Sequence, residues 1–292
     1  MGKAGCLQGK TFMSFNEQWA EIGGLRMRYS QAGEGRPLLL IHGLLGGSFC
    51  WRFTIPALAK QYSVYAVDLP GSGLSDAPPQ TDCSMEAQAA RLLQFIRELE
   101  LRDLTVIGAS WGGAIALLLA AMFADADAES RLRSLVLCAP VTPWSLLGRE
   151  RIRFFKSPLG GCLLRMIWPV SRPLHALALK RMYGDPARIS PGSYEGYASM
   201  IVRPARARNM LNALRSWRKD IDLLQNMISR VKFPALLAWG ALDGAVDIRS
   251  AEVLRQVLPN CELALFPGVG HLPFEEVPVD FNERVLKFLS TR

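Results

Sequence analysis

The sequence is poor in histidine and lacks the residue spacings that bind metals. Its 292 residues include three histidines, His42, His175 and His271, which lie far apart along the chain. The six cysteines, at positions 6, 50, 83, 138, 162 and 261, form no Cys-x-x-Cys pair. A zinc site is therefore disfavoured. We expect reduced cysteines, small core residues at 138 and 261, and neither a metal nor another cofactor.

The sequence also lacks a long apolar run. The longest run lies around residues 113–124 and is far shorter than the roughly 20 residues that a membrane span needs. The segment 1–11 contains Lys3 and Lys10 but no apolar stretch as long as that of a secretory signal. We therefore expect a soluble, cytoplasmic protein.

Five consecutive residues carry the strongest functional signal. Residues 108–112 read Gly-Ala-Ser-Trp-Gly and fit the pattern Gly-x-Ser-x-Gly. A β-branched run at 104–107 predicts a buried strand before them, and the Ala- and Leu-rich run 113–124 predicts a buried helix after them. This order indicates a nucleophile elbow, a sharp turn that presents the hydroxyl of Ser110 above the sheet edge. Its small residues leave room for a strained backbone.

Strands and helices alternate along most of the chain, which favours an α/β fold with a mostly parallel sheet covered on both faces. A Gly-Gly pair at 23–24 predicts a tight turn, and Ser84 is expected to cap a helix. The expected strands are 17–22, 25–32, 38–41, 64–67, 104–107, 134–138, 233–239 and 262–266, and the expected helices are 51–60, 85–99, 113–124, 249–258 and 279–289.

Residues 144–220 interrupt this alternation with short helical segments and several Pro and Gly residues. We interpret them as an inserted helical lid, with residues 1–143 and 221–292 forming the core domain. The predicted lid has fifteen Lys and Arg residues and four acidic ones, a net charge of +11, whereas the whole chain carries +8. No nucleic-acid motif accompanies this charge, so nucleic acid is not expected as a partner.

Three interpretations of the basic lid remain open: a solvated face, a contact with an anionic membrane surface, and an attraction for an anionic substrate. The apolar residues 163, 164 and 166–168, which surround Arg165, fit the membrane contact. A substrate pocket explains the same residues. The larger lid side chains are expected to be core or pocket lining, namely Trp144, Phe154, Phe155, Met166, Trp168 and Met200.

A serine nucleophile needs a base, and the base needs an orienting acid. His271 lies between Gly270 and Leu272-Pro273, in a loop after the last expected strand, and is the candidate base. Asp243 follows the strand before it and is the candidate acid, with Asp247 as the alternative. No acidic residue follows the strand that ends near Cys138. The expected catalytic residues are therefore Ser110, Asp243 and His271.

Two backbone N–H groups are expected to stabilise the oxyanion that forms during acyl transfer. One belongs to Trp111, directly after the nucleophile. The other belongs to Leu44, in the loop His42-Gly43-Leu44-Leu45-Gly46-Gly47. The glycines allow this loop to approach a substrate closely. A phosphate-binding loop is disfavoured, because the Lys and Ser/Thr of that motif are absent.

Five motifs in one order resemble the α/β-hydrolase fold superfamily, over the whole chain except the predicted lid. They are His42-Gly43, the segment 68–75, the serine motif at 108–112, Trp239-Gly240-x-x-Asp243 and Gly270-His271. The resemblance implies the α/β-hydrolase fold, a structural role for segment 68–75, and the chain order serine, acid, histidine.

The resemblance also narrows the chemistry. Epoxide hydrolases and haloalkane dehalogenases of this superfamily carry Asp at the tip of the elbow, where this chain has Ser110, so those reactions are disfavoured. The resemblance to serine-dependent members implies an esterase that cleaves a small-molecule ester through an acyl-enzyme. The alternatives are a carbon–carbon bond hydrolase of ring-cleavage products and a non-catalytic binding protein. A proline iminopeptidase is disfavoured, because the His-Gly-Gly-Pro-Gly loop of that group is missing.

Overall fold

The computed structural model describes residues 16–125, 131–145, 153–155, 157–167, 172–201 and 204–292. Cys6, Trp168 and the segment 1–11 lie outside these residues. The described chain forms an eight-stranded sheet with helices on both faces, which is the α/β-hydrolase architecture. Its strands are β1 (Asn16–Ile22), β2 (Leu25–Ala32), β3 (Pro37–Ile41), β4 (Ser63–Val67), β5 (Leu104–Ala109), β6 (Leu132–Cys138), β7 (Ala235–Gly240) and β8 (Cys261–Phe266).

The strand order in the sheet is β1-β2-β4-β3-β5-β6-β7-β8. The pairs β1·β2 and β2·β4 are antiparallel, and every pair from β4 to β8 is parallel. The turn between β1 and β2 places Gly23 and Gly24 at φ +57° and +74°, a conformation that glycine adopts without a side-chain penalty. The inner parallel strands β5 and β7 are fully buried, as strands covered on both faces should be, whereas the edge strand β8 is partly exposed.

The helices are α1 (Ile55–Leu58), α2 (Met85–Glu98), α3 (Trp111–Asp125), α5 (Pro158–Ile167), α6 (Arg172–Met182), α7 (Ser193–Ile201), α8 (Pro204–Met227), α9 (Arg249–Val257), α10 (Pro273–Glu276) and α11 (Pro278–Ser290). Short 3-10 helices are η1 (Ser48–Trp51), η3 (Pro186–Arg188) and η4 (Ile228–Arg230). One apolar core lies between the sheet and α2, α3 and α9, and a second lies between the sheet and α1, α10 and α11. Side chains alternate along a strand, so the strands in the middle of the sheet supply both cores.

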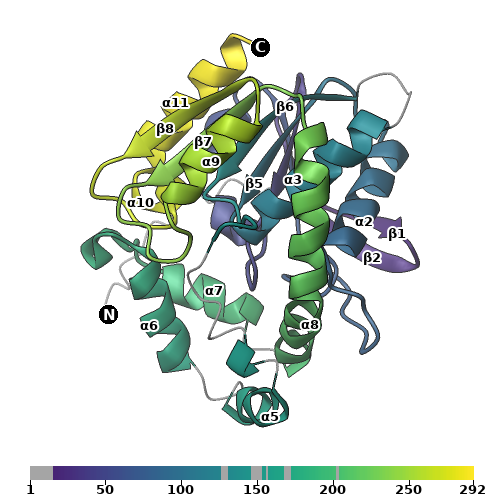
Figure 1. Cartoon of the computed structure of the whole chain (residues 1–292), viewed down its shortest axis with the longest axis vertical. Helices are drawn as coiled ribbons and strands as arrows, with labels where there is room; N and C mark the ends of the chain where they lie inside the picture. Colours follow the sequence, from purple (N-terminus) through teal and green to yellow (C-terminus); the bar gives the residue numbers. More distant parts are fainter. Residues whose placement is uncertain (1–15, 126–130, 146–152, 156, 168–171, 202–203) are drawn as a thin grey trace, which may run out of the picture.

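In the sequence, the helices α5 to α8 lie between β6 and β7. Figure 1 shows α5, α6 and α7 together at one end of the molecule, beyond the sheet. The helix α8 runs back along the core and packs against α2 and α3. It continues past residue 220, which we predicted to be the last residue of the lid.

Two local predictions had different outcomes. The cap on α2 is confirmed, because the hydroxyl oxygen of Ser84 accepts a 3.1 Å hydrogen bond from the N–H of Ala87. The continuous helix over 51–60 is wrong, because the chain forms η1, a turn, and then the short α1. Pro56 lies at the start of α1. Proline lacks an N–H and its ring clashes with the preceding helical turn, so a helix begins there and does not pass through.

No described helix combines the length and the apolar character that a membrane crossing requires. Cys50, Cys83, Cys138, Cys162 and Cys261 are free thiols. Cys138 is buried as predicted, whereas Cys261 is only half-buried.

Candidate active site

Ser110 occupies the sharp turn between β5 and α3. Its φ of +53° lies in the left-handed region, which non-glycine residues rarely adopt. The turn is held on both sides: the N–H of Ser110 donates to the carbonyl of Cys138 at 2.8 Å, and its carbonyl accepts from the N–H of Gly113 at 3.0 Å. Such an over-determined, strained residue is typical of a functional turn.

The glycines of the serine motif are required by close backbone contacts. A Cβ on Gly112 would lie 2.3 Å from the carbonyl oxygen of His42, and one on Gly108 would lie 2.5 Å from that of Gly112. No side chain fits at these distances. The missing side chains therefore allow the loop after β3 to pack directly against the turn that carries Ser110.

Asp243 and His271 form a hydrogen-bonded pair. The Nδ1–H of His271 donates to Oδ2 of Asp243 at 2.8 Å, while Oδ1 of Asp243 accepts from the N–H groups of Ala245 and Val246 at 2.8 and 2.9 Å. The side chains of His271 and Asp243 are 6% and 0% exposed. The carboxylate thereby fixes both the tautomer and the orientation of the ring, and it leaves Nε2 as the basic nitrogen.

Asp247, the alternative acid, and His42, a second histidine among the described residues, are held by other contacts. The carboxylate of Asp247 pairs with the guanidinium of Arg249, which lowers the pKa of Asp247. The ring of His42 is buried, with Nδ1 donating to the carbonyl of Gly43 at 2.7 Å and Nε2 accepting from the N–H of Leu69 at 3.1 Å. Both ring nitrogens of His42 are engaged in holding loops.

Leu44 and Trp111 flank Ser110 from two elements. Trp111 is the first residue of α3, so its N–H has no helical acceptor one turn earlier. Leu44 belongs to a turn closed by a 3.0 Å hydrogen bond from the N–H of Gly46 to the carbonyl of Gly43. Within that turn Leu45 has φ +63°, a second strained residue beside the serine.

Ser110 and His271 line one large cavity of about 600 Å³. Its walls come from the loop after β3, from α6 and from α7. Most of the lining is apolar, including Leu44, Leu179, Met182, Ala198 and Phe274. The only formally charged side chain that lines it among the described residues is Glu195, and no described Lys or Arg lines it. The volume is that of a pocket for a small organic ligand.

The site combines a serine at a strained strand-to-helix turn, a hydrogen-bonded His–Asp pair and a parallel sheet. A family model described as the alpha/beta hydrolase fold matches residues 36–278. This chain belongs to the α/β hydrolase fold family. The fold and the relatives indicate a hydrolase.

Similar proteins within the family catalyse different reactions. The chain is 28% identical to a soluble epoxide hydrolase of Corynebacterium sp., covering 93% of this chain and 96% of the relative. It is 25% identical to the 2-hydroxy-6-oxo-6-(2'-aminophenyl)hexa-2,4-dienoic acid hydrolase of Metapseudomonas resinovorans, covering 100% and 97%. The solved structure of the epoxide hydrolase CorEH superposes with a TM-score of 0.79 at 26% identity, over 95% of this chain and 99% of that one.

Several side chains that line the cavity of this α/β hydrolase were not predicted. His175, Leu179 and Met182 of α6 and Tyr194 and Tyr197 of α7 all face it. Burial lowers the pKa of His175 and raises that of Tyr197, so the former is held neutral as a base and the latter as a phenol.

Two large side chains of the insertion do not lie where we expected. Met166 is 73% exposed and Phe154 is 44% exposed, so neither is core, and neither lines the cavity. Trp144 packs against the larger core as expected. Helical spacing indicates which residues share a face, but only the tertiary structure shows what that face meets.

Two buried carboxylates connect the insertion of the hydrolase to its core, and no sequence motif pointed to them. Glu275 accepts hydrogen bonds from Arg52 at 2.8 and 3.0 Å, from the hydroxyl of Tyr183 at 2.8 Å and from that of Tyr197. Glu276 accepts from the N–H groups of Gly270, Gly184 and Asp185 at 2.8, 2.9 and 2.9 Å. Buried carboxylates require such partners.

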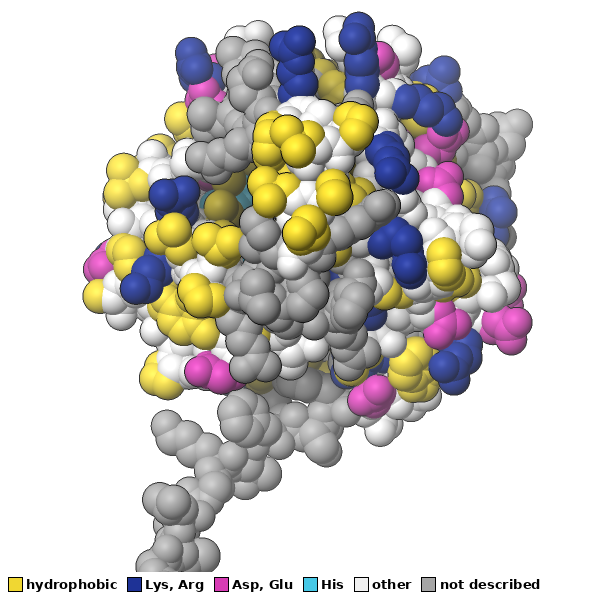
Figure 2. Space-filling model, turned by 90° about the horizontal axis from the view of Figure 1, so that it is seen from below, with side chains coloured by type: hydrophobic (Ala, Val, Ile, Leu, Met, Phe, Trp, Pro, Cys, Tyr) yellow, Lys and Arg dark blue, Asp and Glu magenta, His cyan; other side chains and the backbone are white. Residues whose placement is uncertain are grey.

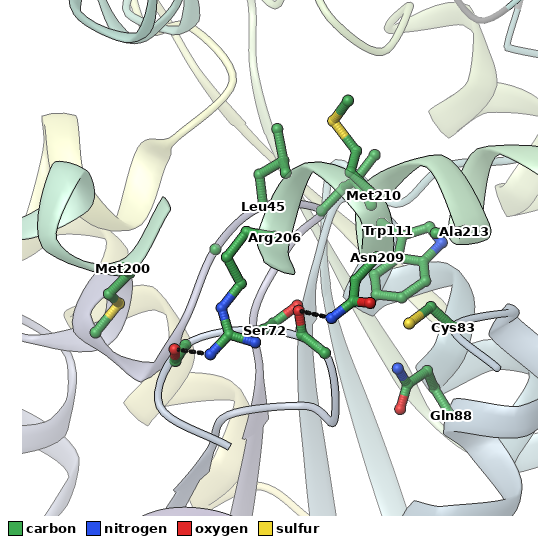
Figure 3. Close-up of a pocket in the computed structure, with 14 residues that line it drawn as sticks. Leu45, Ser72, Cys83, Gln88, Trp111, Met200, Arg206, Asn209, Met210 and Ala213 are labelled. Atoms are coloured by element: carbon green, nitrogen blue, oxygen red, sulfur yellow. Dashed lines mark hydrogen bonds between the residues drawn. The ribbon is translucent and has the colours of Figure 1, made fainter. Parts of the chain in front are cut away.

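The segment 68–75 is held by side chains from both sides. Asp68 accepts from the N–H groups of Ser48 and Leu74 at 2.6 and 2.8 Å. From α8, Arg206 donates to the carbonyl of Gly73 at 2.5 Å and Asn209 to that of Gly71 at 3.3 Å (Figure 3). A cavity of about 20 Å³ lies beside them, room for about one water molecule. Part of the basic charge of the insertion is therefore used inside the protein.

Within the described residues, no three His, Cys, Asp or Glu side chains come together in a way that could hold a metal ion.

Proposed function

We propose that this chain is a serine hydrolase that cleaves carboxylic esters with an apolar acyl group. The observation that carries the proposal is the apolar lining of the cavity that Ser110 and His271 share. A neutral acyl chain gains free energy from such a lining through the hydrophobic effect, whereas a carboxylate there would lose its hydration, and no described Lys or Arg of the lining would pair with it.

In the proposed mechanism, Ser110 is the nucleophile, His271 the base and Asp243 the orienting acid. Oγ of Ser110 forms a bond to the ester carbonyl carbon while its proton moves to Nε2 of His271. Asp243 stabilises the resulting imidazolium through the Nδ1–H contact. The N–H groups of Leu44 and Trp111 donate to the oxyanion of the tetrahedral intermediate.

The intermediate then collapses to products in two stages. The bond between carbonyl carbon and alkoxy oxygen breaks, and Nε2 of His271 gives its proton to the leaving alcohol. A water molecule then attacks the acyl-enzyme while the same nitrogen accepts its proton. The bond between the acyl carbon and Oγ of Ser110 then breaks as that proton passes to Oγ, so the carboxylic acid is released and the enzyme returns to its first state.

Carbon–carbon bond hydrolysis remains the alternative function. The 2-hydroxy-6-oxo-6-(2'-aminophenyl)hexa-2,4-dienoic acid hydrolase, whose name gives a substrate of that kind, matches this chain over its whole length. The substrates of such a hydrolase carry carboxylates, and the basic charge of the insertion favoured an anionic substrate of that kind. Three described arginines of the insertion are engaged: Arg206 and Arg208 donate to backbone carbonyls, and Arg188 contacts Glu276. The cavity therefore supports the ester better. Epoxide hydrolysis is disfavoured, because the elbow carries Ser110.

The proposal is tested with p-nitrophenyl esters from acetyl to palmitoyl, assayed with the wild type and Ser110→Ala. We expect turnover to peak at one acyl length and to fall at least about 10³-fold in the variant. A fluorophosphonate probe should label the wild type at Ser110 only. Turnover that survives in Ser110→Ala would refute the mechanism. Folded protein that cleaves no ester but hydrolyses a vinylogous diketone acid would establish the alternative, and absence of any adduct would favour a binding protein.

A further inference from the structure

The helix α5 exposes an apolar stripe that nothing in the described protein covers. Leu159, Leu163 and Met166 follow one another at intervals of four and three residues, so they lie on one face of the helix. They are 74%, 42% and 73% exposed. A single exposed apolar residue is ordinary, but three in one stripe indicate a surface that meets an apolar phase.

The neighbouring helix α6 adds to this surface and also forms the wall of the cavity. Its Leu174 and Leu177 are 54% and 46% exposed, while His175, Leu179 and Met182 line the cavity. Pro173 and Ala178 are exposed and also line it. The cavity therefore reaches the surface along α6, between the exposed leucines and the catalytic residues.

The exposed apolar side chains are concentrated in this part of the chain. Six of the ten large hydrophobic side chains that are exposed in the described protein lie between residues 154 and 177. We call these six the docking face: Phe154, Leu159, Leu163, Met166, Leu174 and Leu177. Figure 2 shows hydrophobic side chains gathered on the end of the molecule that carries α5 and α6, with Lys and Arg side chains around them.

The charge of the same segment has one sign only. Residues 151–184 contain seven Lys and Arg residues and no Asp or Glu. Of these basic residues, Arg153, Lys180 and Arg181 are described with their side chains, and all three are exposed. An exposed apolar stripe in a segment that carries cations and no acidic residue is the pattern of a helix that lies in the interface of an anionic membrane.

We propose that the docking face binds the surface of a lipid bilayer that contains anionic lipids. The apolar side chains enter the headgroup region, while the surrounding cations meet the negative surface potential. This orientation turns the mouth of the cavity along α6 toward the lipid, so that an acyl ester can pass from the bilayer to Ser110. The passage of substrate rests on the proposed function; the docking itself does not.

The experiment is flotation of the purified full chain with vesicles of phosphatidylcholine, with and without phosphatidylglycerol. We expect binding to the anionic vesicles only, weakened by salt because the electrostatic attraction is screened. Met166→Glu should weaken binding at least about tenfold, because it puts a negative charge at the anionic interface and removes an apolar anchor. Val279→Glu is the matched control, because Val279 is 66% exposed on α11, and it should bind as the wild type does.

A second pair of variants separates the contribution of charge to vesicle binding from that of apolar contact. Lys180→Gln/Arg181→Gln should weaken binding about 25-fold, since each cation near an anionic surface contributes about fivefold. Lys232→Gln/Lys287→Gln removes two exposed cations from the rest of the chain and should change binding little. Equal binding of the two double variants, or of the Met166 and Val279 variants, would overturn the proposal.

An assay of a water-soluble short-chain ester separates this proposal from the proposed function. Met166 and Lys180 do not line the cavity, so their variants should cleave that ester like the wild type. Vesicle binding without esterase activity would refute the esterase and leave the docking intact. A wild-type protein that binds no anionic vesicle would refute the docking. If such a protein were instead a dimer that Met166→Glu dissociates, the face would belong to a second copy of the chain.

Discussion

The backbone N–H of His271 donates a 2.6 Å hydrogen bond to the carbonyl oxygen of Met182. Met182 ends α6, a helix of the insertion, so the proposed catalytic base is held in part by a segment outside the sheet. The contact is close, because a Cβ on Gly270 would lie 2.4 Å from the same carbonyl oxygen. The candidate site is therefore formed by the insertion and the core together.

Glu276 is expected to hold these two segments together. Its side chain is 0% exposed and accepts from backbone N–H groups of the His271 loop and of the segment after α6. Glu276→Gln places an NH₂ group where a backbone N–H needs an acceptor, so we expect a loss of about 2–3 kcal/mol in the free energy of unfolding. Urea denaturation measures it, with Glu283→Gln on the exposed side of α11 as control. Equal midpoints for the two variants would contradict the role of Glu276.

Asp243 is expected to be essential and Asp247 dispensable. In Asp243→Asn, His271 loses the acceptor that fixes its tautomer, so kcat should fall about 10³- to 10⁴-fold. Asp247→Asn breaks only the contact with Arg249 and should keep kcat within about twofold. Both are measured as ester turnover, with circular dichroism to confirm folding. A larger loss of kcat in the Asp247 variant than in the Asp243 variant would assign the role of orienting acid to Asp247.

Gly240 at the end of β7 is expected to be required for the position of His271. A Cβ there would lie 1.9 Å from the carbonyl oxygen of Gly270 and 2.4 Å from that of Val269. Gly240→Ala must therefore displace the loop that carries the base, and kcat should fall about 10²-fold or more, since small misplacements of catalytic groups are costly. In Gly244→Ala the added Cβ meets nothing within 4 Å, so this variant should retain activity. Similar activities of the two alanine variants would show that the loop adapts.

The stability of the protein should fall in acid in part through His42. Burial lowers the pKa of its imidazole, because the charged ring would lose its hydration. The unfolded chain, with a histidine pKa near 6.5, then binds a proton at the His42 ring more strongly than the native state does. The free energy of unfolding should therefore decrease as the pH falls below about 6.5, down to the native pKa.

Denaturation curves between about pH 5 and pH 8 test this expectation. The contribution of His42 to the slope of the free energy of unfolding against pH should be absent in His42→Gln. That variant starts from lower stability, because it loses the contacts that the His42 ring makes with two loops. His175→Gln should change the slope less, since His175 is only half-buried, while burial lowers its pKa as well. An unchanged slope in His42→Gln would contradict the assignment.

The local patterns predicted most of the core elements because they depend on neighbouring residues. The helix that begins after Ser84 is capped by that residue, and the alternation of buried strands and helices produced a covered parallel sheet. The prediction of one helix failed at 51–60, where Pro56 lies at the start of a separate short helix. Prediction also failed for Phe154 and Met166, whose exposure depends on how the segment before α5 and α5 itself pack against the rest of the protein.

The sequence by itself determined that Ser110 lies at a sharp turn and that Asp243 and His271 follow the last two strands. In a parallel sheet the carboxyl ends of the strands share one edge, so these residues had to come near one another. Only the tertiary structure decided that Asp243 rather than Asp247 contacts His271, that Glu276 joins the His271 loop to α6, and that the cavity wall is apolar. Those contacts join residues far apart along the chain, and their geometry depends on the packing of whole helices.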